Sequence, residues 1–150
     1  MNTPLLADSV WVELVQLAQA VSAQLRVFYA DPAALDIQHK ADESPVTAAD
    51  LAAHQMIEQG LQQLTPTIPL LSEESADHAV RHAWDRFWLV DPLDGTKEFI
   101  NRTGEFTVNI ALIDQGQVHA ALIAIPMQQQ VYAMAQGHVW RIGADQVWHV

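Results

Sequence analysis

Residues 88–99 read Trp-Leu-Val-Asp-Pro-Leu-Asp-Gly-Thr-Lys-Glu-Phe, and we expect the rest of the chain to be organised around this stretch. The run Phe87 to Val90 has the composition of a buried strand and delivers Asp91 to the strand's end. The dipeptide Asp94-Gly95 is typical of a turn or of a helix start. We therefore predict a short helix over residues 96–101, with Asp94 as its N-cap.

The bend after this strand gathers oxygen atoms that suit a divalent cation. Asp91 and Asp94 are three residues apart, so their carboxylates can converge on one point, with the Leu93 carbonyl between them. Two carboxylates and a carbonyl form a hard-oxygen cluster suited to Mg²⁺. The amides of Gly95 and Thr96 open the predicted helix, where free N–H groups favour a phosphate. A cation cluster beside an anion-binding backbone is what a metal-dependent phosphatase needs.

The same residues also have a purely structural interpretation. Asp-Pro and Asp-Gly dipeptides are common turn formers, and an aspartate at a helix start needs no metal. A calcium-binding EF-hand is excluded by spacing, because with Gly95 as its glycine the earlier ligand positions would be Val90 and Pro92. On these residues alone, a metal site and a simple turn both stay open.

Two amphipathic helices are predicted upstream of the central stretch. The first begins at Thr3-Pro4 and ends at Asp31-Pro32. Its apolar residues recur at steps of three and four: Val10, Leu14, Leu17, Val21, Leu25 and Phe28. The second begins after Thr47, the predicted N-cap, with Asp50 completing a capping-box variant. Residues 32–46, between the helices, are expected to be irregular.

Strands account for most of the remaining chain. A short strand at Ile68–Leu71 precedes Ser72-Glu73-Glu74-Ser75, whose plain interpretation is a solvated turn, and residues 76–86 have the character of an exposed loop. Further strands separated by short turns are expected at 107–113, 118–125, 131–135, 139–142 and from 147 onward. Short connections imply antiparallel neighbours, so we predict an α+β fold with two long helices packed on an antiparallel β-sheet.

Composition excludes several classes of function. The chain has no cysteine, which rules out disulfides and thiol catalysis and fits a cytoplasmic protein. Its formal net charge of −11 argues against a nucleic-acid groove, because Lys and Arg bind phosphate backbones. No P-loop, dinucleotide fingerprint or zinc-type histidine spacing occurs, and no apolar tract reaches membrane-spanning length. An acidic protein that binds phosphates needs local neutralisation, for which divalent cations are the obvious means.

Two motifs carry a resemblance to a known family. Asp91-Pro-Leu-Asp-Gly-Thr resembles the signature of the inositol monophosphatase-like, lithium-sensitive phosphatase superfamily, and Pro45-Val-Thr-Ala-Ala-Asp50 is similar to a second pattern of that family. The continuation Lys97-Glu98-Phe99 resembles the branch of 3′(2′),5′-bisphosphate nucleotidases, whereas inositol monophosphatases usually continue with Thr-Asn-Phe. The resemblance runs from about residue 10 to the last residue.

This resemblance implies a reaction and a cofactor. The reaction is Mg²⁺-dependent hydrolysis of the 3′-phosphate of 3′-phosphoadenosine 5′-phosphate, which gives AMP and phosphate in nucleotide recycling and sulfate assimilation. The resemblance also implies lithium inhibition and a cytoplasmic protein that is peripheral on the inner face of the membrane. An inositol- or sugar-phosphate phosphatase, or a non-catalytic fragment that only binds metal or a partner, stays open as an alternative.

Roles for individual residues follow from the same resemblance. The implied metal ligands are Glu73, Asp91, the carbonyl of Leu93, and Asp94. The residues implied to contact substrate are Glu73, Leu93, Asp94, Gly95, Thr96 and Lys97. Glu73 and Thr96 would orient the attacking water, and Asp50 would point into the site and help to hold a further metal or a water. Lys97 would recognise the extra charge of the substrate or simply be a solvated lysine.

The family has a second domain, and nothing in this sequence matches it. That domain supplies a further metal-binding aspartate in a Trp-Asp-x-Ala-Ala-Gly pattern. Residues 1–150 thus resemble the N-terminal metal-binding α+β domain of such an enzyme, with the C-terminal domain absent. We expect an exposed apolar edge where the second domain would pack, through which the chain could self-associate.

Overall fold

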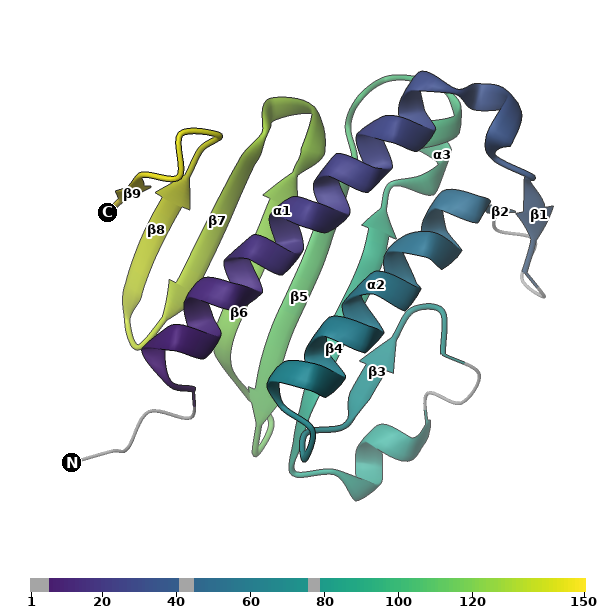
Figure 1. Ribbon diagram of the computed structural model, residues 1–150. Coiled ribbons are helices and arrows are strands. Elements are labelled where there is room, and N and C mark those ends of the chain that lie inside the picture. Colours follow the sequence, from purple (N-terminus) through teal and green to yellow (C-terminus); the bar gives the residue numbers. More distant parts are fainter. Residues whose placement is uncertain (1–5, 41–44, 76–78) are drawn as a thin grey trace.

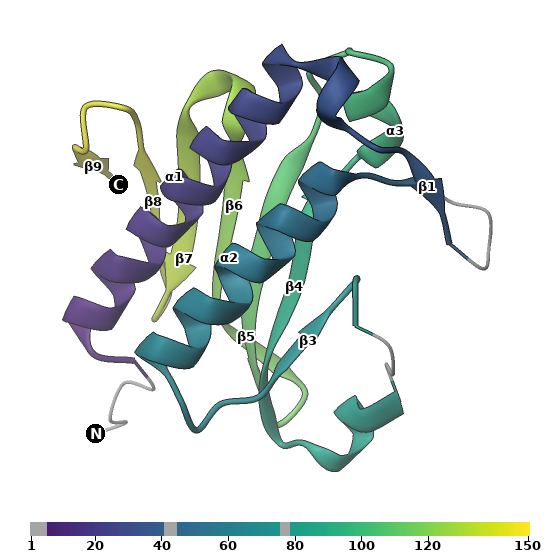
Figure 2. The same ribbon diagram turned by 45° about the vertical axis from the view of Figure 1, so that its right-hand side comes forward.

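The computed structural model describes residues 6–40, 45–75 and 79–150, which form two layers. Helices α1 (Asp8–Ala30) and α2 (Ala48–Leu64) lie side by side on one face of a seven-stranded sheet, as Figure 1 and Figure 2 show. Two long helices packed on a sheet confirm the predicted α+β fold. Among the described residues, none of the helices has the length and apolar character needed to cross a membrane.

The strands lie in the sheet in their order along the chain. They are β3 (Leu70–Ser72), β4 (Arg86–Asp94), β5 (Thr107–Asp114), β6 (Gln117–Ile125), β7 (Gln130–Ala135), β8 (His138–Ile142) and β9 (Trp148–His149). From β4 onward every neighbouring pair is antiparallel, as predicted. The exception is β3, which runs parallel to β4. Residues 73–85 are long enough for the crossover that a parallel pair requires, so the sheet is mostly rather than wholly antiparallel.

Helix α1 buries the apolar stripe that its periodicity predicted. Leu14, Val21 and Leu25 are fully buried, and other members of the stripe pack against the core from its margin. The helix ends at Ala30 with Asp31 as its C-cap, as expected before a proline. The helix begins at Asp8, with the extended residue Ala7 as its N-cap, so the predicted start at Thr3-Pro4 was wrong, although residues 3 and 4 themselves lie outside the described residues.

Helix α2 begins with the predicted capping box. The Thr47 hydroxyl accepts the N–H groups of Ala49 at 3.2 Å and Asp50 at 3.4 Å. In return, the Asp50 carboxylate accepts the N–H of Thr47 at 2.9 Å. Both side chains satisfy backbone donors that a helix start leaves without partners, and both residues are 1% exposed. The capping box therefore fixes a buried carboxylate at the first turn of α2.

Two connecting segments are more regular than predicted. Residues 32–46 include the 3₁₀ helix η1 (Pro32–Ala34) and an antiparallel pair of short strands, β1 (Gln38–His39) and β2 (Pro45–Val46). The 3₁₀ helix η2 (Ala79–Ala83) lies in the second segment, whose residues 76–78 are outside the described part. The prediction of irregular structure was wrong here because such short elements leave no periodic pattern.

The sheet face opposite the two helices carries exposed apolar side chains. On β4, Trp88 and Val90 are buried under the helices, so Leu89 between them faces the other side. The exposed apolar side chains of this open face are Leu89, Val118, Ile123, Tyr132 and Val139. The apolar surface expected from the sequence thus lies on a face of the sheet rather than at an edge.

Candidate metal and phosphate site

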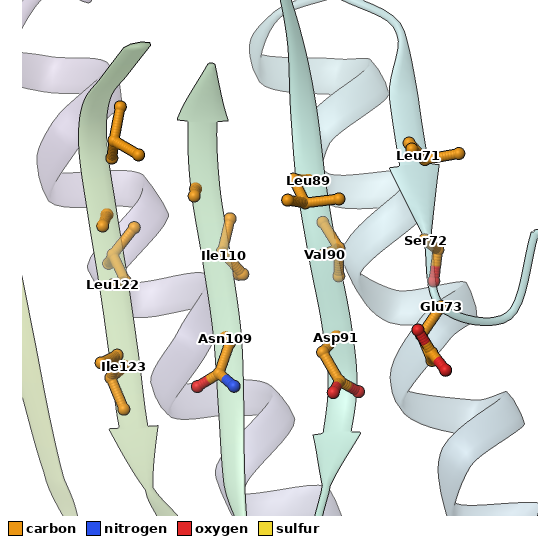
Figure 3. Close-up of a pocket in the computed structure, with 13 residues that line it drawn as sticks. Leu71, Ser72, Glu73, Leu89, Val90, Asp91, Asn109, Ile110, Leu122 and Ile123 are labelled. Atoms are coloured by element: carbon orange, nitrogen blue, oxygen red, sulfur yellow. The ribbon is translucent and has the colours of Figure 1, made fainter. Parts of the chain in front are cut away.

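Acidic side chains gather where β3 and β4 end and β5 begins. Because β3 and β4 are parallel and Ser72 pairs with Val90, Glu73 follows at the level of Asp91. The N–H of Glu73 extends this pairing by donating to the Val90 carbonyl at 2.9 Å. Figure 3 shows Glu73, Asp91 and Asn109 next to one another across the three strands. Parallel pairing therefore brings two acids that are distant in sequence to one edge.

A β-bulge between Asp91 and Asp94 shapes this edge. On β5, Asn109 pairs with Asp91 and Thr107 pairs with Asp94, so β4 contains one extra residue. Pro92 lies inside the bulge and has no N–H to give to the ladder. The Leu93 backbone favours the charged form of the Asp91 carboxylate and so lowers its pKa. The predicted bend is thus a bulge within a strand that continues to Asp94.

The environment of Asp91 is rich in negative charge. Burial and neighbouring carboxylates raise the pKa of Asp91 to about 6 from its ordinary value of 3.8. Those carboxylates belong to Asp94, Glu73 and Asp50, so the charged groups that act most strongly on Asp91 are all acids. Ionised Asp91 is therefore costly in this environment, and a bound cation would relieve that cost.

Asp94 bonds to a neighbouring strand and does not cap the short helix. Its Oδ2 accepts a hydrogen bond from Asn109 Nδ2 at 3.2 Å. The other end of that amide, Asn109 Oδ1, accepts from the Thr107 hydroxyl at 3.1 Å. The N-cap of α3 (Thr96–Ile100) is Gly95, and no side chain caps it. The N-cap prediction for Asp94 was wrong because the bulge keeps residue 94 inside the strand.

Gly95 is required by its backbone conformation and by its surroundings. Its φ of 94° lies in the left-handed region that favours glycine. A Cβ at this position would lie 2.8 Å from the backbone oxygen of Glu105. The Gly95 carbonyl accepts the N–H of Phe99 at 2.8 Å, which closes the first turn of α3. Glycine thus lets the chain turn tightly from the bulge into the helix, while phosphate binding by the Gly95 and Thr96 amides stays a prediction.

The hydroxyl of Thr96 joins the two helix starts. It donates to Asp50 Oδ1 at 2.8 Å and lies 3.4 Å from the Leu93 carbonyl oxygen. The other carboxylate oxygen of Asp50 is taken by the backbone and hydroxyl of Thr47. The structure therefore brings together Asp50, Thr96 and the Leu93 carbonyl, three groups that the sequence resemblance assigned to one site.

A lysine that the sequence did not assign contacts the paired glutamates. Lys40 Nζ lies 3.1 Å from Glu74 Oε1 and 3.9 Å from Glu73 Oε1. Burial lowers the pKa of Lys40, but the hydrogen bond to Glu74 and the nearby carboxylates outweigh this and raise it. The side chain of Glu74 is only 8% exposed, whereas that of Glu73 is 58% exposed. Glu73 is thus the more accessible glutamate of the pair, and its role as a ligand stays a prediction.

The donor atoms at this edge suit Mg²⁺ in kind, although they do not form a closed cage. Carboxylates and a backbone carbonyl are the hard-oxygen ligands that Mg²⁺ prefers. As they stand, no three His, Cys, Asp or Glu side chains of the described residues are grouped closely enough to hold a metal ion. Asp94 bonds to Asn109 and Glu73 lies near Lys40, so the carboxylates do not meet at one point. The predicted ligand set stays a prediction that the local charge supports.

A pocket of about 510 Å³ opens on the sheet face beside the acidic edge. Figure 3 shows it, with apolar side chains such as Leu89 and Ile123 along the strands and Glu73, Asp91 and Asn109 at one end. Neither this pocket nor Asn109 was predicted, because both depend on which strands are neighbours. Lys97 is exposed on α3, and its role in substrate binding stays a prediction.

Comparison with known proteins places this geometry in a family. Residues 7–144 match the sequence model of the Inositol monophosphatase family. The 3′(2′),5′-bisphosphate nucleotidase CysQ of Escherichia coli O6:H1 is 50% identical over 130 residues, covering 86% of this chain and 53% of that protein. The protein of the same name from Buchnera aphidicola is 35% identical over 139 residues, covering 89% of this chain and 52% of the relative. The chain therefore spans about half the length of these relatives.

Solved structures resemble the fold in the same way. The extragenic suppressor protein suhB from Bartonella henselae superposes with a TM-score of 0.80 at 28% identity, covering 93% of this chain and 53% of that one. CysQ from Bacteroides thetaiotaomicron, described as a bacterial member of the inositol monophosphatase family, gives a TM-score of 0.74 at 37% identity. The match covers 91% of this chain and 49% of that one. With its sequence matched over residues 7–144 and its fold shared with these structures, the chain belongs to the inositol monophosphatase family.

Proposed function

We propose that this chain carries the metal- and phosphate-binding half of a 3′(2′),5′-bisphosphate nucleotidase. The substrate would be 3′-phosphoadenosine 5′-phosphate, and the products AMP and phosphate. The observation that carries this proposal is the accumulation of negative charge at Asp91, whose pKa is raised by burial and by the acids Asp94, Glu73 and Asp50. The relatives named CysQ support the nucleotidase reaction over other phosphatase reactions of the family.

Four groups of this chain would hold Mg²⁺. They are the side chains of Glu73, Asp91 and Asp94 and the carbonyl of Leu93. When bound, Mg²⁺ would act as a Lewis acid that makes water a usable nucleophile near neutral pH and neutralises phosphoryl charge. The excess of negative charge around Asp91 supports this assignment, because it would be relieved by a divalent cation.

Thr96 and Asp50 would position the attacking water. Thr96 donates its only hydroxyl proton to Asp50 Oδ1 at 2.8 Å, so its oxygen retains lone pairs that can accept a hydrogen bond from a water. Thr47 holds the other oxygen of Asp50, which keeps the Thr96 hydroxyl in this orientation. The exposed carboxylate of Glu73 would accept a hydrogen bond from the other O–H group of the same water.

The start of α3 would bind the phosphoryl group. Gly95 and Thr96 supply backbone N–H groups at the start of this helix, and oxygens of the phosphoryl group would accept hydrogen bonds from them. Lys97 follows on the same short helix with an exposed side chain, where it would contact the second phosphate of a bisphosphate nucleotide. The proposed reaction belongs to the complete family fold, of which this chain spans about half.

Calorimetry and phosphate release test this function. We expect this chain to bind Mg²⁺, and Asp91→Asn to weaken that binding by about tenfold or more, since a charged ligand is lost. Phosphate release would be measured with the longest polypeptide that contains this sequence, and 3′-phosphoadenosine 5′-phosphate should be hydrolysed faster than inositol phosphate. Unchanged Mg²⁺ affinity in Asp91→Asn contradicts the metal assignment, and faster hydrolysis of inositol phosphate favours the sugar-phosphatase alternative.

A further inference from the structure

A histidine on α2 reaches from the helix to the acidic end of β3. His54 lies one helical turn after Asp50, and its side chain is 18% exposed. Its Nδ1 atom is 2.9 Å from the Ser72 hydroxyl, and its Nε2 atom is 3.2 Å from Glu58 Oε2 on the next turn of α2. His54 thus connects a carboxylate on the helix to the residue that directly precedes Glu73.

Ser72 organises the turn that carries the paired glutamates. Its hydroxyl oxygen accepts the N–H of Glu74 at 3.2 Å, and its own N–H donates to the Ser75 hydroxyl at 2.8 Å. The N–H of Ser75 returns to the Ser72 carbonyl at 2.9 Å. Ser72 is 1% exposed, so its polar groups depend on these partners rather than on water. Glu73 stands between the bonded residues of this turn, and the orientation of its backbone follows from them.

The hydrogen-bond directions form one consistent chain. The Glu58 carboxylate can only accept, so the imidazole nitrogen that faces it, Nε2, carries a proton. In the tautomer with its proton on Nε2, His54 Nδ1 accepts the single proton of the Ser72 hydroxyl, whose oxygen accepts from Glu74. Without His54 the buried Ser72 hydroxyl would lose the group that fixes its rotamer, and the Glu74 N–H would lose a fixed acceptor.

We propose that His54 is a positioning residue: through Ser72 it fixes the turn that carries Glu73 and thereby raises the affinity of the site for Mg²⁺. Its action on the turn is independent of the proposed function, whereas its effect on Mg²⁺ rests on that function. A residue that merely stabilises α2 would act on the stability of the helix and leave the Glu73 turn unchanged.

Two substitutions separate these roles, because they place an amide at different positions. The amide of His54→Asn lies where Nδ1 is and can still accept the Ser72 proton, whereas the amide of His54→Gln extends to the position of Nε2 and cannot replace Nδ1. Gln is the better helix former, so an effect on the helix alone would make His54→Asn the more damaging change. Positioning through Ser72 requires the opposite order. His119→Gln, at an exposed histidine of β6, is the control.

Two measurements on this chain decide between these outcomes. We expect His54→Gln to accelerate hydrogen exchange of the Glu74 amide about fivefold or more, as for the loss of one hydrogen bond. We expect it also to weaken Mg²⁺ binding about tenfold, within the range seen when a partner of a metal ligand is lost. His54→Asn and His119→Gln should stay close to the unaltered chain in both measurements.

The proposal is overturned if His54→Gln leaves Glu74 exchange unchanged, or if His54→Asn is at least as damaging as His54→Gln. If His54→Gln does not fold, His54→Ala removes the Nδ1 atom while leaving the Ser72 hydroxyl in place, and it should accelerate Glu74 exchange to a similar extent. If the unaltered chain binds no Mg²⁺, the proposed function fails, and Glu74 exchange alone then decides whether His54 positions the turn.

Discussion

The two ends of the β4–β5 pair place an aspartate in opposite electrostatic environments. At one end the strands pair in regular register, and Arg86 holds Asp114 through Nε at 3.2 Å and Nη2 at 3.4 Å. At the other end the register shifts through a bulge, and the pKa of Asp91 is raised by burial and by further acids. One pair of strands therefore contains an aspartate that is neutralised within the chain and another that is surrounded by like charge.

This contrast supports the proposal that the bulged end is the functional one. In an ion pair such as Arg86–Asp114 the carboxylate is already neutralised by the chain, so a bound cation would add little there. Carboxylates that lie close together destabilise the fold unless a cation is bound. Groups with such perturbed pKa values are concentrated at binding and active sites. The comparison can be tested by changing each end separately.

The largest effect is expected from the glycine that ends the bulge. Gly95→Ala should lower the free energy of unfolding by about 3 kcal/mol, because the new Cβ meets a backbone oxygen at a positive φ. Gly116→Ala, in the β5–β6 turn, is the matched control: its φ is also positive, but nothing lies within 4 Å, so about 1 kcal/mol is expected. Urea unfolding of both variants measures the difference, and equal losses would contradict the tight packing at Gly95.

Mg²⁺ should stabilise the chain through the bulged end only. At a concentration 100 times the dissociation constant, a ligand that binds only the folded state adds about 2.7 kcal/mol. Thermal unfolding with and without Mg²⁺ should show this gain in full in the unaltered chain and in Asp114→Asn, but only about half of it or less in Asp91→Asn, which should bind Mg²⁺ about tenfold or more weakly. An undiminished gain in Asp91→Asn would place the cation elsewhere.

Without Mg²⁺, replacing aspartate by asparagine should change the free energy of unfolding in opposite directions at the two ends. Asp91→Asn should raise the free energy of unfolding at pH 7 by about 1 kcal/mol, after allowance for the solvent that screens this half-buried group. Asn loses the repelled charge. Asp114→Asn should lower the free energy of unfolding by about 0.5 kcal/mol, the typical contribution of a surface ion pair. Chemical unfolding in the presence of a chelator is the measurement, and two effects of the same sign would refute the comparison.

The smallest expected effect is the pH dependence of the stability difference between Asp91→Asn and the unaltered chain. Between pH 3.8 and about 6, folded Asp91 keeps a proton that the unfolded chain releases, so the stability contributed by this group falls as pH rises. The advantage of Asp91→Asn should therefore disappear near pH 4 and reach about half its full size near pH 5. Unfolding curves of both proteins across this range measure it, and a constant difference would show that Asp91 titrates normally.

The features that could be predicted from the sequence are those whose partners are close together in the chain. The α2 capping box joins Thr47 to Asp50, and the stripe of α1 repeats every three or four residues. A turn of positive-φ residues, Gln115 and Gly116, lies where the sequence placed one. Each follows from local geometry, so the α+β fold and the course of β4 as far as Asp91 could be predicted without knowing the tertiary contacts.

The features that escaped prediction depend on distant partners. Asp94 was assigned to the helix start, but Asn109, 15 residues away, binds it because the bulge keeps it in the strand. Lys40 was given no role, but it contacts Glu74 at a separation of 34 residues. Neither contact leaves a periodic pattern or a local motif, and each depends on how the strands and connecting segments are arranged in space.

The parallel pairing of β3 with β4 makes the site tolerant of insertions in the segment that connects these strands. Glu73 is held level with Asp91 by the ladder itself, through the hydrogen bond from its N–H to Val90. The spacing between the two acids is therefore independent of how many residues connect the strands. A fluorescent reporter inserted between residues 79 and 85, in the connection that precedes β4, should therefore leave both acids in place.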